Sequence, residues 1–298
     1  MKLCRYILYH IITVLYNSYK LLLKKKMSQT PNIVIAGFTG DRSGSMCSMK
    51  NAPSDGLFAW INDQKKSVKD NSQVGKFFVS TFDDKHEVRL DGQNISDTNV
   101  TLEQCREWME PRSMTKLYDS AINDLNRLIQ AKTDYEENMP RSLKTLDPKI
   151  VIVWACMTDG NDNSSTNTMV DFKNKVKEAQ DEHDIKCFFL GANQDAIMTG
   201  RQYGFQEGCS LTFGSSERCA GNALRSVTQV MRHASSGSKK VGFSESMRVS
   251  SAPPVPQIAQ PQYFNSRRDY YNSINSNNVN RIMSTHRQSL KTSTAKIN

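Results

Sequence analysis

The feature that most constrains the fold is the run KIVIVWACM at 149–157, in which eight apolar residues follow Lys149. A run with no polar alternation is typical of a strand buried on both faces, as in a parallel sheet. Further strand patterns lie before and after it, and a turn at Asp83-Asp84 predicts that one of them pairs as an antiparallel hairpin. The sequence predicts strands at 33–38, 76–82, 86–90, 149–157, 185–190 and 209–213.

Between these strands, apolar residues recur at helical spacing. The pattern predicts helices at 54–68, 102–109, 117–129, 167–183, 195–203 and 217–231. Strands that alternate with helices favour an α/β fold. We expect a Rossmann-like three-layer sandwich, with a mostly parallel central sheet, one antiparallel edge strand and helices on both faces. Trp60 and Trp154 are expected in its core.

Charge divides the chain into three parts. The formal net charge is +9, but residues 1–26 carry +6, residues 27–232 carry −4 and residues 233–298 carry +7. A basic chain could suggest nucleic acid or anionic membrane as a partner. Here the central part is mildly acidic, so the basic character belongs to the two ends and must be considered separately from the domain.

The N-terminal end, 1–26, contains an apolar run at 7–23 that His10, Asn17 and Lys20 interrupt. Three interpretations stay open: a spurious extension upstream of Met27, a signal anchor that tethers the chain to a membrane or virion, and a processed signal peptide.

The C-terminal end, 233–298, is rich in Ser, Asn and Pro, which predicts a disordered basic tail. Its aromatic and Arg residues alternate around 263–271, a pattern that could bind nucleic acid. An association with nucleic acid through this tail is therefore an alternative function.

Seven cysteines are present, and no C-x-x-C motif occurs. The odd count and the spacing indicate neither a disulfide framework nor a zinc site. Cys156 and Cys187 lie in apolar runs, where cysteine usually behaves as a small buried side chain. Unpaired cysteines are typical of proteins in a reducing compartment. We therefore expect a cytoplasmic protein, with membrane anchoring through 1–26 as the alternative.

Polar side chains gather in three segments that follow or precede the predicted elements: 41–45, 113–115 and 158–160. In an open α/β sheet, ligands bind at the carboxyl ends of the strands, near the point where the strand order reverses. The three segments offer two carboxylates and several hydroxyls there. These hard oxygen donors suit Mg²⁺ or Mn²⁺, and the set holds no Cys or His that would favour zinc.

The same segments resemble the von Willebrand factor type A domain family. The matching pieces are DRSGSM at 41–46, TKLYDS at 115–120 and MTDG at 157–160, in the family's order, within a domain at 31–232. FFLGANQDA at 188–196 is similar to the intracellular and phage-type single-domain branch. The resemblance implies a metal-ion-dependent adhesion site, and the residues that match its ligands are Asp41, Ser43, Ser45, Thr115 and Asp159.

In this family, a partner's Asp or Glu fills the coordination position that the protein leaves open. We therefore expect a divalent-cation-dependent protein-binding module and not an enzyme. His86, His183 and His233 fall outside the three segments, so no nucleophile and base lie together in sequence.

Other acidic residues near these segments have simpler interpretations. Asp119 is expected to cap or position its helix, and Asp162 to be a solvated loop residue. Asn193 and Asp195 are expected to form a turn and a helix N-cap.

Overall fold

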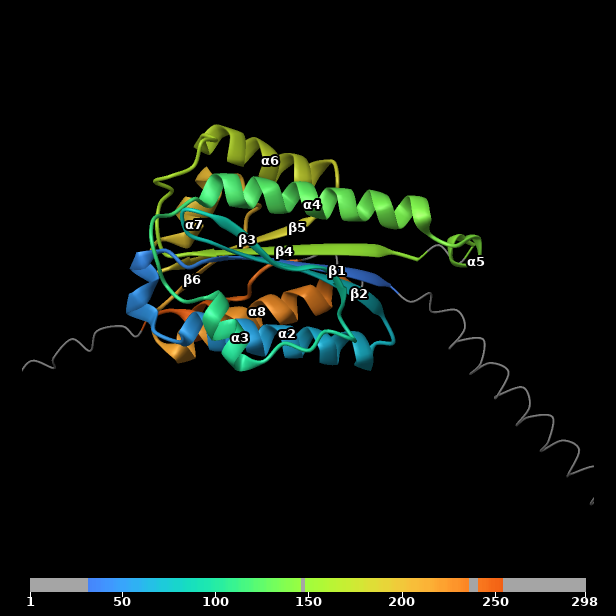
Figure 1. Ribbon diagram of the computed structural model, residues 1–298, viewed down its shortest axis with the longest axis horizontal. Coiled ribbons are helices and arrows are strands. Elements are labelled where there is room, and N and C mark those ends of the chain that lie inside the picture. Colours follow the sequence, from blue (N-terminus) through green and yellow to red (C-terminus); the bar gives the residue numbers. More distant parts are fainter. Residues whose placement is uncertain (1–31, 146–147, 236–240, 254–298) are drawn as a thin grey trace, which may run out of the picture. The chain divides into compact units, whose positions relative to one another are not determined.

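The apolar run at 149–157 forms β4 (Ile150–Thr158), in which eight of nine residues are buried. β4 pairs in parallel with β1 (Ile33–Asp41) on one side and β5 (Lys186–Ala192) on the other. The computed structural model describes residues 32–145, 148–235 and 241–253 (Figure 1). Its sheet has the order β3-β2-β1-β4-β5-β6, completed by β2 (Val74–Phe82), β3 (His86–Asn94) and β6 (Ser210–Phe213).

Only the β2–β3 pair is antiparallel among these strands, and β3 lies at the edge. The predicted fold class is thus confirmed: a mostly parallel sheet with one antiparallel edge strand and helices on both sides. The chain runs outward from β1 to β2 and β3 and then returns to β4 on the other side of β1. The strand order therefore reverses between β1 and β4, which is where ligand sites form in sheets of this kind.

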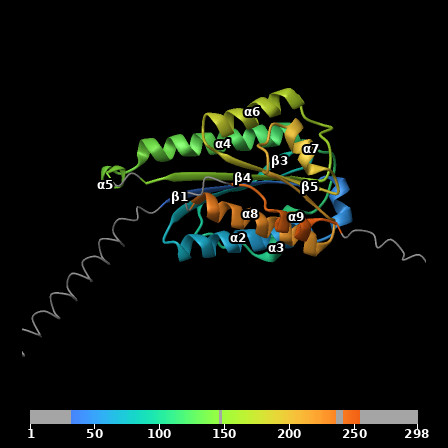
Figure 2. The same cartoon turned by 180° about the vertical axis from the view of Figure 1, so that it is seen from behind.

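Helices cover both faces of the sheet, as Figures 1 and 2 show. One face carries α2 (Ala52–Asp70), α3 (Leu102–Trp108) and α8 (Glu217–Ser235). The other carries α4 (Leu117–Asn138), α6 (Met169–Asp181) and α7 (Ala196–Gln202). Short helices η1 (Gly44–Met49), α5 (Arg141–Lys144) and α9 (Glu245–Ser251) complete the described elements.

The strands place alternate side chains in two separate cores, because successive residues of a strand point to opposite faces. Trp154 is fully buried in the core under α4 and α6, while Val153 and Ala155 lie in the core under α2 and α8. Trp60 of α2 is 1% exposed in that second core. Both tryptophans are buried, as predicted.

α4 continues nine residues beyond the predicted end at 129. Its last turns, AKTDYEEN, lack a fully buried apolar stripe, although Ala131 and Tyr135 pack partly against the core. Most of these residues are adequate or good helix formers, so the helix continues where the apolar pattern no longer marks it. Sequence periodicity reports the buried part of a helix and misses an exposed extension.

The predicted tail, 233–298, begins too early. Residues 241–253 are part of the folded unit: Phe243 is buried, and Gly214 N donates to Ser251 O at 3.0 Å. Arg248 Nη1 also donates to Ser210 O at 2.7 Å, so α9 covers the edge strand β6. A Ser-rich composition predicted disorder, but contacts with β6 and α8 order this segment.

Residues 1–26 and 254–298 lie outside the described part of the chain, and so do the anchor and nucleic-acid interpretations that depend on them. Within the described ranges, none of the helices is both long enough and apolar enough to span a membrane.

The close approach of β1 and β2 requires glycine at position 75. A Cβ on Gly75 would lie 2.6 Å from Val34 O and 2.7 Å from Ile95 Cδ1. We expect Gly75→Ala to lower the free energy of unfolding by about 1–3 kcal/mol, because a backbone carbonyl cannot move away cheaply. Urea denaturation measures this loss.

Gly221→Ala is the matched control, since a Cβ there meets nothing within 4 Å inside α8. It should stabilise the protein by roughly 0.5–1 kcal/mol through the lower backbone entropy of the unfolded chain. Equal effects of the two substitutions would contradict the packing argument.

Candidate metal centre

The first predicted ligand, Asp41, is the last residue of β1 and is fully buried. Its pairing with Phe82 holds it in the sheet. Thr158 Oγ1, at the end of β4, donates to Asp41 Oδ2 at 2.5 Å, and Ser43 N donates to Asp41 Oδ1 at 2.7 Å. The carboxylate therefore lies between the ends of β1 and β4, where the strand order reverses.

The loop at 41–45, which follows β1 and is called the first loop below, is linked by side-chain contacts to the end of β4. Ser43 Oγ and Ser45 Oγ lie 3.1 Å apart, and Ser45 Oγ donates to Asp159 Oδ1 at 2.7 Å. Thus four of the five predicted ligands, from two loops separated by more than a hundred residues, form one connected cluster of oxygen atoms. A Cβ on Gly160 would lie 3.9 Å from Ser45 Oγ, so the Asp159 loop passes close to the first loop.

The fifth predicted ligand, Thr115, is buried and contacts its neighbours through its main chain. Thr115 N donates to Asn163 Oδ1 at 2.7 Å, and Asn163 N donates to Thr115 O at 2.9 Å. Its loop also meets the first loop, since Gly44 N donates to Ser113 O at 3.0 Å. In the described structure no hydrogen bond joins the Thr115 hydroxyl to the other four residues, so Thr115 lies in an adjoining loop but outside their cluster.

Burial dominates the electrostatics of the two carboxylates. It raises the pKa of Asp41 to about 6, although hydrogen bonds from Thr158 and Ser43 partly oppose the rise. Burial likewise raises the pKa of Asp159, and the hydrogen bond from Ser45 opposes it. Among the described residues no basic side chain forms an ion pair with either carboxylate. A bound cation would supply the missing counter-charge, so the residues fit one.

The donor set also limits which ion can bind. No group of three or more His, Cys, Asp and Glu side chains that could hold a metal occurs in the part of the chain that the structure describes. A cation at this position would therefore depend on two carboxylates together with hydroxyl oxygens and water. Such ligands suit hard cations.

Two further acids shape the loop after β4. Asp119, in the first turn of α4, accepts hydrogen bonds from Thr166 N at 3.0 Å and Asn167 N at 2.8 Å. Burial raises its pKa, but these bonds outweigh burial, and the net shift is downward. Asp119 thus anchors the loop after β4 to α4, whereas the sequence predicted that it would cap or position its own helix; the N-cap residue of α4 is Lys116.

Asp162 is tied into the same loop and differs from the solvated residue expected from sequence. Its Oδ2 accepts from Tyr118 N at 3.1 Å and from Ser165 Oγ at 2.5 Å. Asp195 caps α7, because its Oδ1 accepts from Ile197 N and Met198 N at 3.1 and 3.0 Å. The N-cap prediction for Asp195 is confirmed.

Sequence reasoning missed Thr158, whose hydroxyl contacts Asp41, although Thr158 stands next to Asp159 in the motif. It also missed the cluster that Arg42 forms with Asp83 and Arg112 beside the first loop. The only sequence signal for that cluster was an arginine inside an otherwise small and polar motif.

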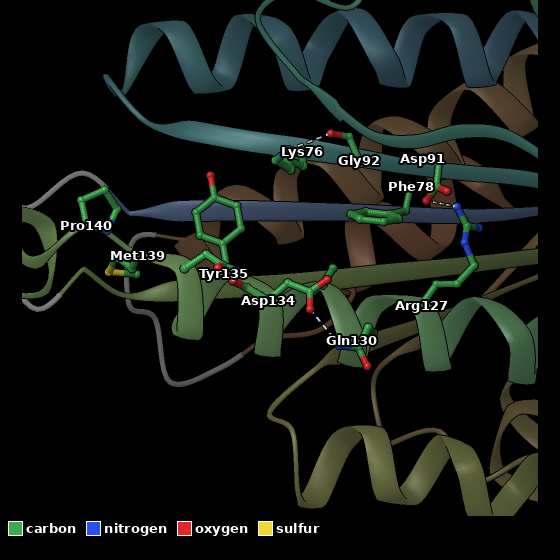
Figure 3. A pocket seen from close by; sticks show the side chains of 12 residues that line it. Lys76, Phe78, Asp91, Gly92, Arg127, Gln130, Asp134, Tyr135, Met139 and Pro140 are labelled. Carbon is green, nitrogen blue, oxygen red and sulfur yellow. Dashed lines mark hydrogen bonds and ion pairs between the residues drawn. The ribbon is translucent and has the colours of Figure 1, made fainter.

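A cavity of about 610 Å³ lies elsewhere, between α4 and the β2–β3 hairpin (Figure 3). Its charged side chains are already bonded within its walls: Arg127 pairs with Asp91 at 2.7 Å, and Lys76 Nζ donates to Gly92 O at 3.0 Å. None of the five predicted ligands lines it. The cavity is therefore separate from the candidate metal centre.

The sheet order, the antiparallel edge strand and the helices on both faces define a Rossmann-like α/β domain, with loops that meet at the β1–β4 reversal of strand order. No family model matches the sequence, and no curated protein matches it.

One solved structure with a similar fold is proximal thread matrix protein 1 from the mussel byssus, with zinc in its metal-ion-dependent adhesion site motif. Its sequence is 14% identical to this chain, and the TM-score is 0.42. The match covers 68% of this chain and 46% of that one. A von Willebrand factor type A protein from Catenulispora acidiphila has 14% identity and TM-score 0.43, with 68% and 43% covered. The pilus adhesin SpaC from Lactobacillus rhamnosus GG has 10% identity and TM-score 0.46, with 68% and 31% covered. The chain thus spans less than half the length of these proteins, and the likeness concerns the fold alone.

Removing the Asp119 carboxylate should loosen the loop after β4. We expect Asp119→Ala to cost about 1–3 kcal/mol, because the hydrogen bonds that the charged carboxylate accepts from Thr166 N and Asn167 N are lost. The amides of Thr166 and Asn167 should exchange faster with solvent, which hydrogen-exchange mass spectrometry or NMR can follow. Unchanged protection of both amides would contradict the anchoring role.

The cost of Asp119→Ala should also depend on pH. The folded-state pKa of Asp119 lies below its ordinary value of 3.8. The contribution of the Asp119 carboxylate to the free energy of unfolding is therefore fully present above pH 3.8, and it is lost as the pH falls through the lower pKa of the folded state. The difference in unfolding free energy between wild type and variant should be constant near neutral pH and shrink at acid pH.

Proposed function

We propose that the domain predicted at 31–232, which the structure extends to 253, is a protein-binding module that uses a divalent cation. The observation that carries the proposal is the connected oxygen cluster of Asp41, Ser43, Ser45 and Asp159 at the reversal of strand order. The Asp41 carboxylate is buried, that of Asp159 is half-buried, and neither has a basic partner among the described residues.

Asp41 and Asp159 would provide the negative charge for the cation, and Ser43, Ser45 and Thr115 would provide hydroxyl oxygens, some through water. When bound, the cation supplies a Lewis-acidic centre with a coordination position for an outside ligand. Two carboxylates nearly neutralise a divalent ion, so the carboxylate of a partner's Asp or Glu is not repelled. Such a carboxylate is the ligand that we propose.

The proposed ion is Mg²⁺ or Mn²⁺. The zinc named for the mussel byssus protein belongs to that protein, whereas this chain presents only oxygen atoms in the cluster. Carboxylate, hydroxyl and water ligands favour hard ions, and zinc prefers sites with nitrogen or sulfur.

Binding, and not catalysis, is the proposed role. His86 contacts Asp124 at 3.0 Å, and His183 lies 3.8 Å from Glu178, so both imidazoles face residues outside the oxygen cluster. The serines of the cluster contact each other and a carboxylate, and neither contacts a histidine base. This arrangement supports coordination more than acyl or phosphoryl transfer.

A cytoplasmic, reducing location remains part of the proposal. The six described cysteines are free thiols, and five of them are buried. Burial raises the pKa of Cys105 to about 12 and that of Cys209 to about 11, which keeps both in the unreactive thiol form.

The cation can be tested directly by isothermal titration of the full chain with Mg²⁺. We expect saturable binding to the wild type and none to Asp41→Ala/Asp159→Ala, because the double variant lacks both charged ligands. At Mg²⁺ a hundred times above its Kd, the unfolding free energy of the wild type should rise by about 2.7 kcal/mol.

Asp195→Ala is the matched control, because Asp195 lies at the same edge of the sheet but caps α7. It should bind Mg²⁺ like the wild type. Equal heats for the wild type and the double variant would show that the cluster does not bind the ion.

Partner binding should depend on the same ion. Proteins captured by the immobilised full chain in Mg²⁺ should be released by EDTA, and Asp159→Ala should not retain them. Each captured protein should lose affinity when a single acidic residue on its surface is replaced by its amide. Capture that EDTA leaves unchanged would contradict a metal-mediated contact.

A further inference from the structure

Two of the loops at the candidate metal centre share one buried carboxylate that is not among its ligands. Asp83 is fully buried in the turn after β2. Arg112 Nε donates to Asp83 Oδ2, and Arg42 Nε lies 3.4 Å from the same oxygen. Arg42 stands between Asp41 and Ser43, and Arg112 lies three residues before Thr115. One carboxylate thus binds the ligand-bearing loops at 41–45 and 112–116.

Main-chain hydrogen bonds join the same pieces of chain. Arg42 N donates to Phe82 O at 2.8 Å, and Lys116 N donates to Asp83 O at 2.7 Å. Arg112 N in turn donates to Arg42 O at 2.8 Å. The end of β2 and the turn after it therefore support both loops. Arg42, next to Asp41, is hydrogen-bonded to Phe82, and Lys116, next to Thr115, is hydrogen-bonded to Asp83.

Glu87 of β3 closes the cluster from outside. It accepts from Arg42 Nη2, from Arg89 Nη2 and, at 2.7 Å, from Arg112 Nη2. The side chain of Arg42 is 3% exposed, whereas that of Arg112 is 48% exposed. Hence the contact between Arg42 and Asp83 is shielded from solvent, and the more exposed side chains of Glu87 and Arg112 lie over it.

Stability alone gives a weak reason for this arrangement. Burying an ion pair costs desolvation, and apolar residues of similar size often stabilise a protein as well or better. The backbone is also constrained here: Ser113 has φ 55°, and in that conformation its carbonyl accepts the hydrogen bond of Gly44 N. A residue at positive φ and a buried contact between Arg42 and Asp83 thus join two ligand loops, and a binding site needs such fixed contacts in order to be preformed.

We propose that Asp83 is a positioning residue of the metal centre: through Arg42 and Arg112 it holds the two loops at the spacing that the cation requires. Asp83 does not contact the ion. This inference rests on the proposed function, because it assigns to Asp83 the preorganisation of that same site.

The test compares Asp83→Asn with Asp124→Asn in Mg²⁺ titrations of the full chain. Asp124 is a matched control: it is also buried and also pairs with an arginine, Arg127 at 2.7 Å, but its partners are not in the ligand loops. We expect Asp83→Asn to weaken Mg²⁺ binding by about 10–100-fold, the range typical of residues that orient metal ligands. Asp124→Asn should lower the thermal midpoint but bind Mg²⁺ like the wild type.

Arg112→Gln keeps the experiment decisive if Asp83→Asn does not fold. Because its side chain is half-exposed, this substitution should leave the fold intact and still weaken Mg²⁺ binding at least several-fold. Arg89→Gln is its control, since Arg89 contacts Glu87 but not Asp83.

The outcomes separate the two proposals. If the wild type binds no Mg²⁺, the proposed function fails. If the wild type binds, and the folded variants of Asp83 and Arg112 bind no more weakly than their controls, the function stands and the positioning role of Asp83 is wrong.

Discussion

The parallel pairing of β1 with β4 is the interaction on which the candidate centre depends. Its register places the end of β1 beside the end of β4, so that Thr158 reaches Asp41 and the next residue, Asp159, reaches Ser45. The chain leaves β1 toward one edge of the sheet and resumes at β4 toward the other. The connecting loops therefore diverge at this point. Ser45 is exposed and Asp159 half-buried there, while Asp41 and Ser43 lie buried beneath them.

The centre combines rigid support with incomplete charge compensation. Two apolar cores hold the strands. Asp119, Asn163 and the Asp83 carbonyl fix the loops after β4 and before α4 through hydrogen bonds to their main chains, and the Asp83 carboxylate holds the loop at 41–45 through the side chain of Arg42. Asp83 has arginine partners, whereas Asp41 and Asp159 have none among the described residues. Acids that serve as supports are thus neutralised inside the protein, and the two that we propose as ligands are left for a cation.

Much of the fold could be predicted because each strand has a local pattern that does not depend on its partners. The predicted strands formed, and the 86–90 segment paired as a hairpin with β2. Errors arose where packing replaced local pattern: α4 continues past 129 as an exposed helix, and the Ser-rich segment that includes α9 is ordered by β6. The loop of Thr115 adjoins the loop at 41–45 and is held through its main chain, so the place of Thr115 among the ligands stays a prediction.

The sequence by itself determined the class of fold and the kinds of atoms at the centre, because apolar periodicity and a short polar motif are local properties. It also showed that the domain is acidic although the whole chain is basic. Only the tertiary structure decided which polar groups meet. The link from Ser45 to Asp159 and the shared use of Asp83 by two arginines join residues far apart in the chain. Such contacts follow from strand register and loop path, which no local pattern encodes.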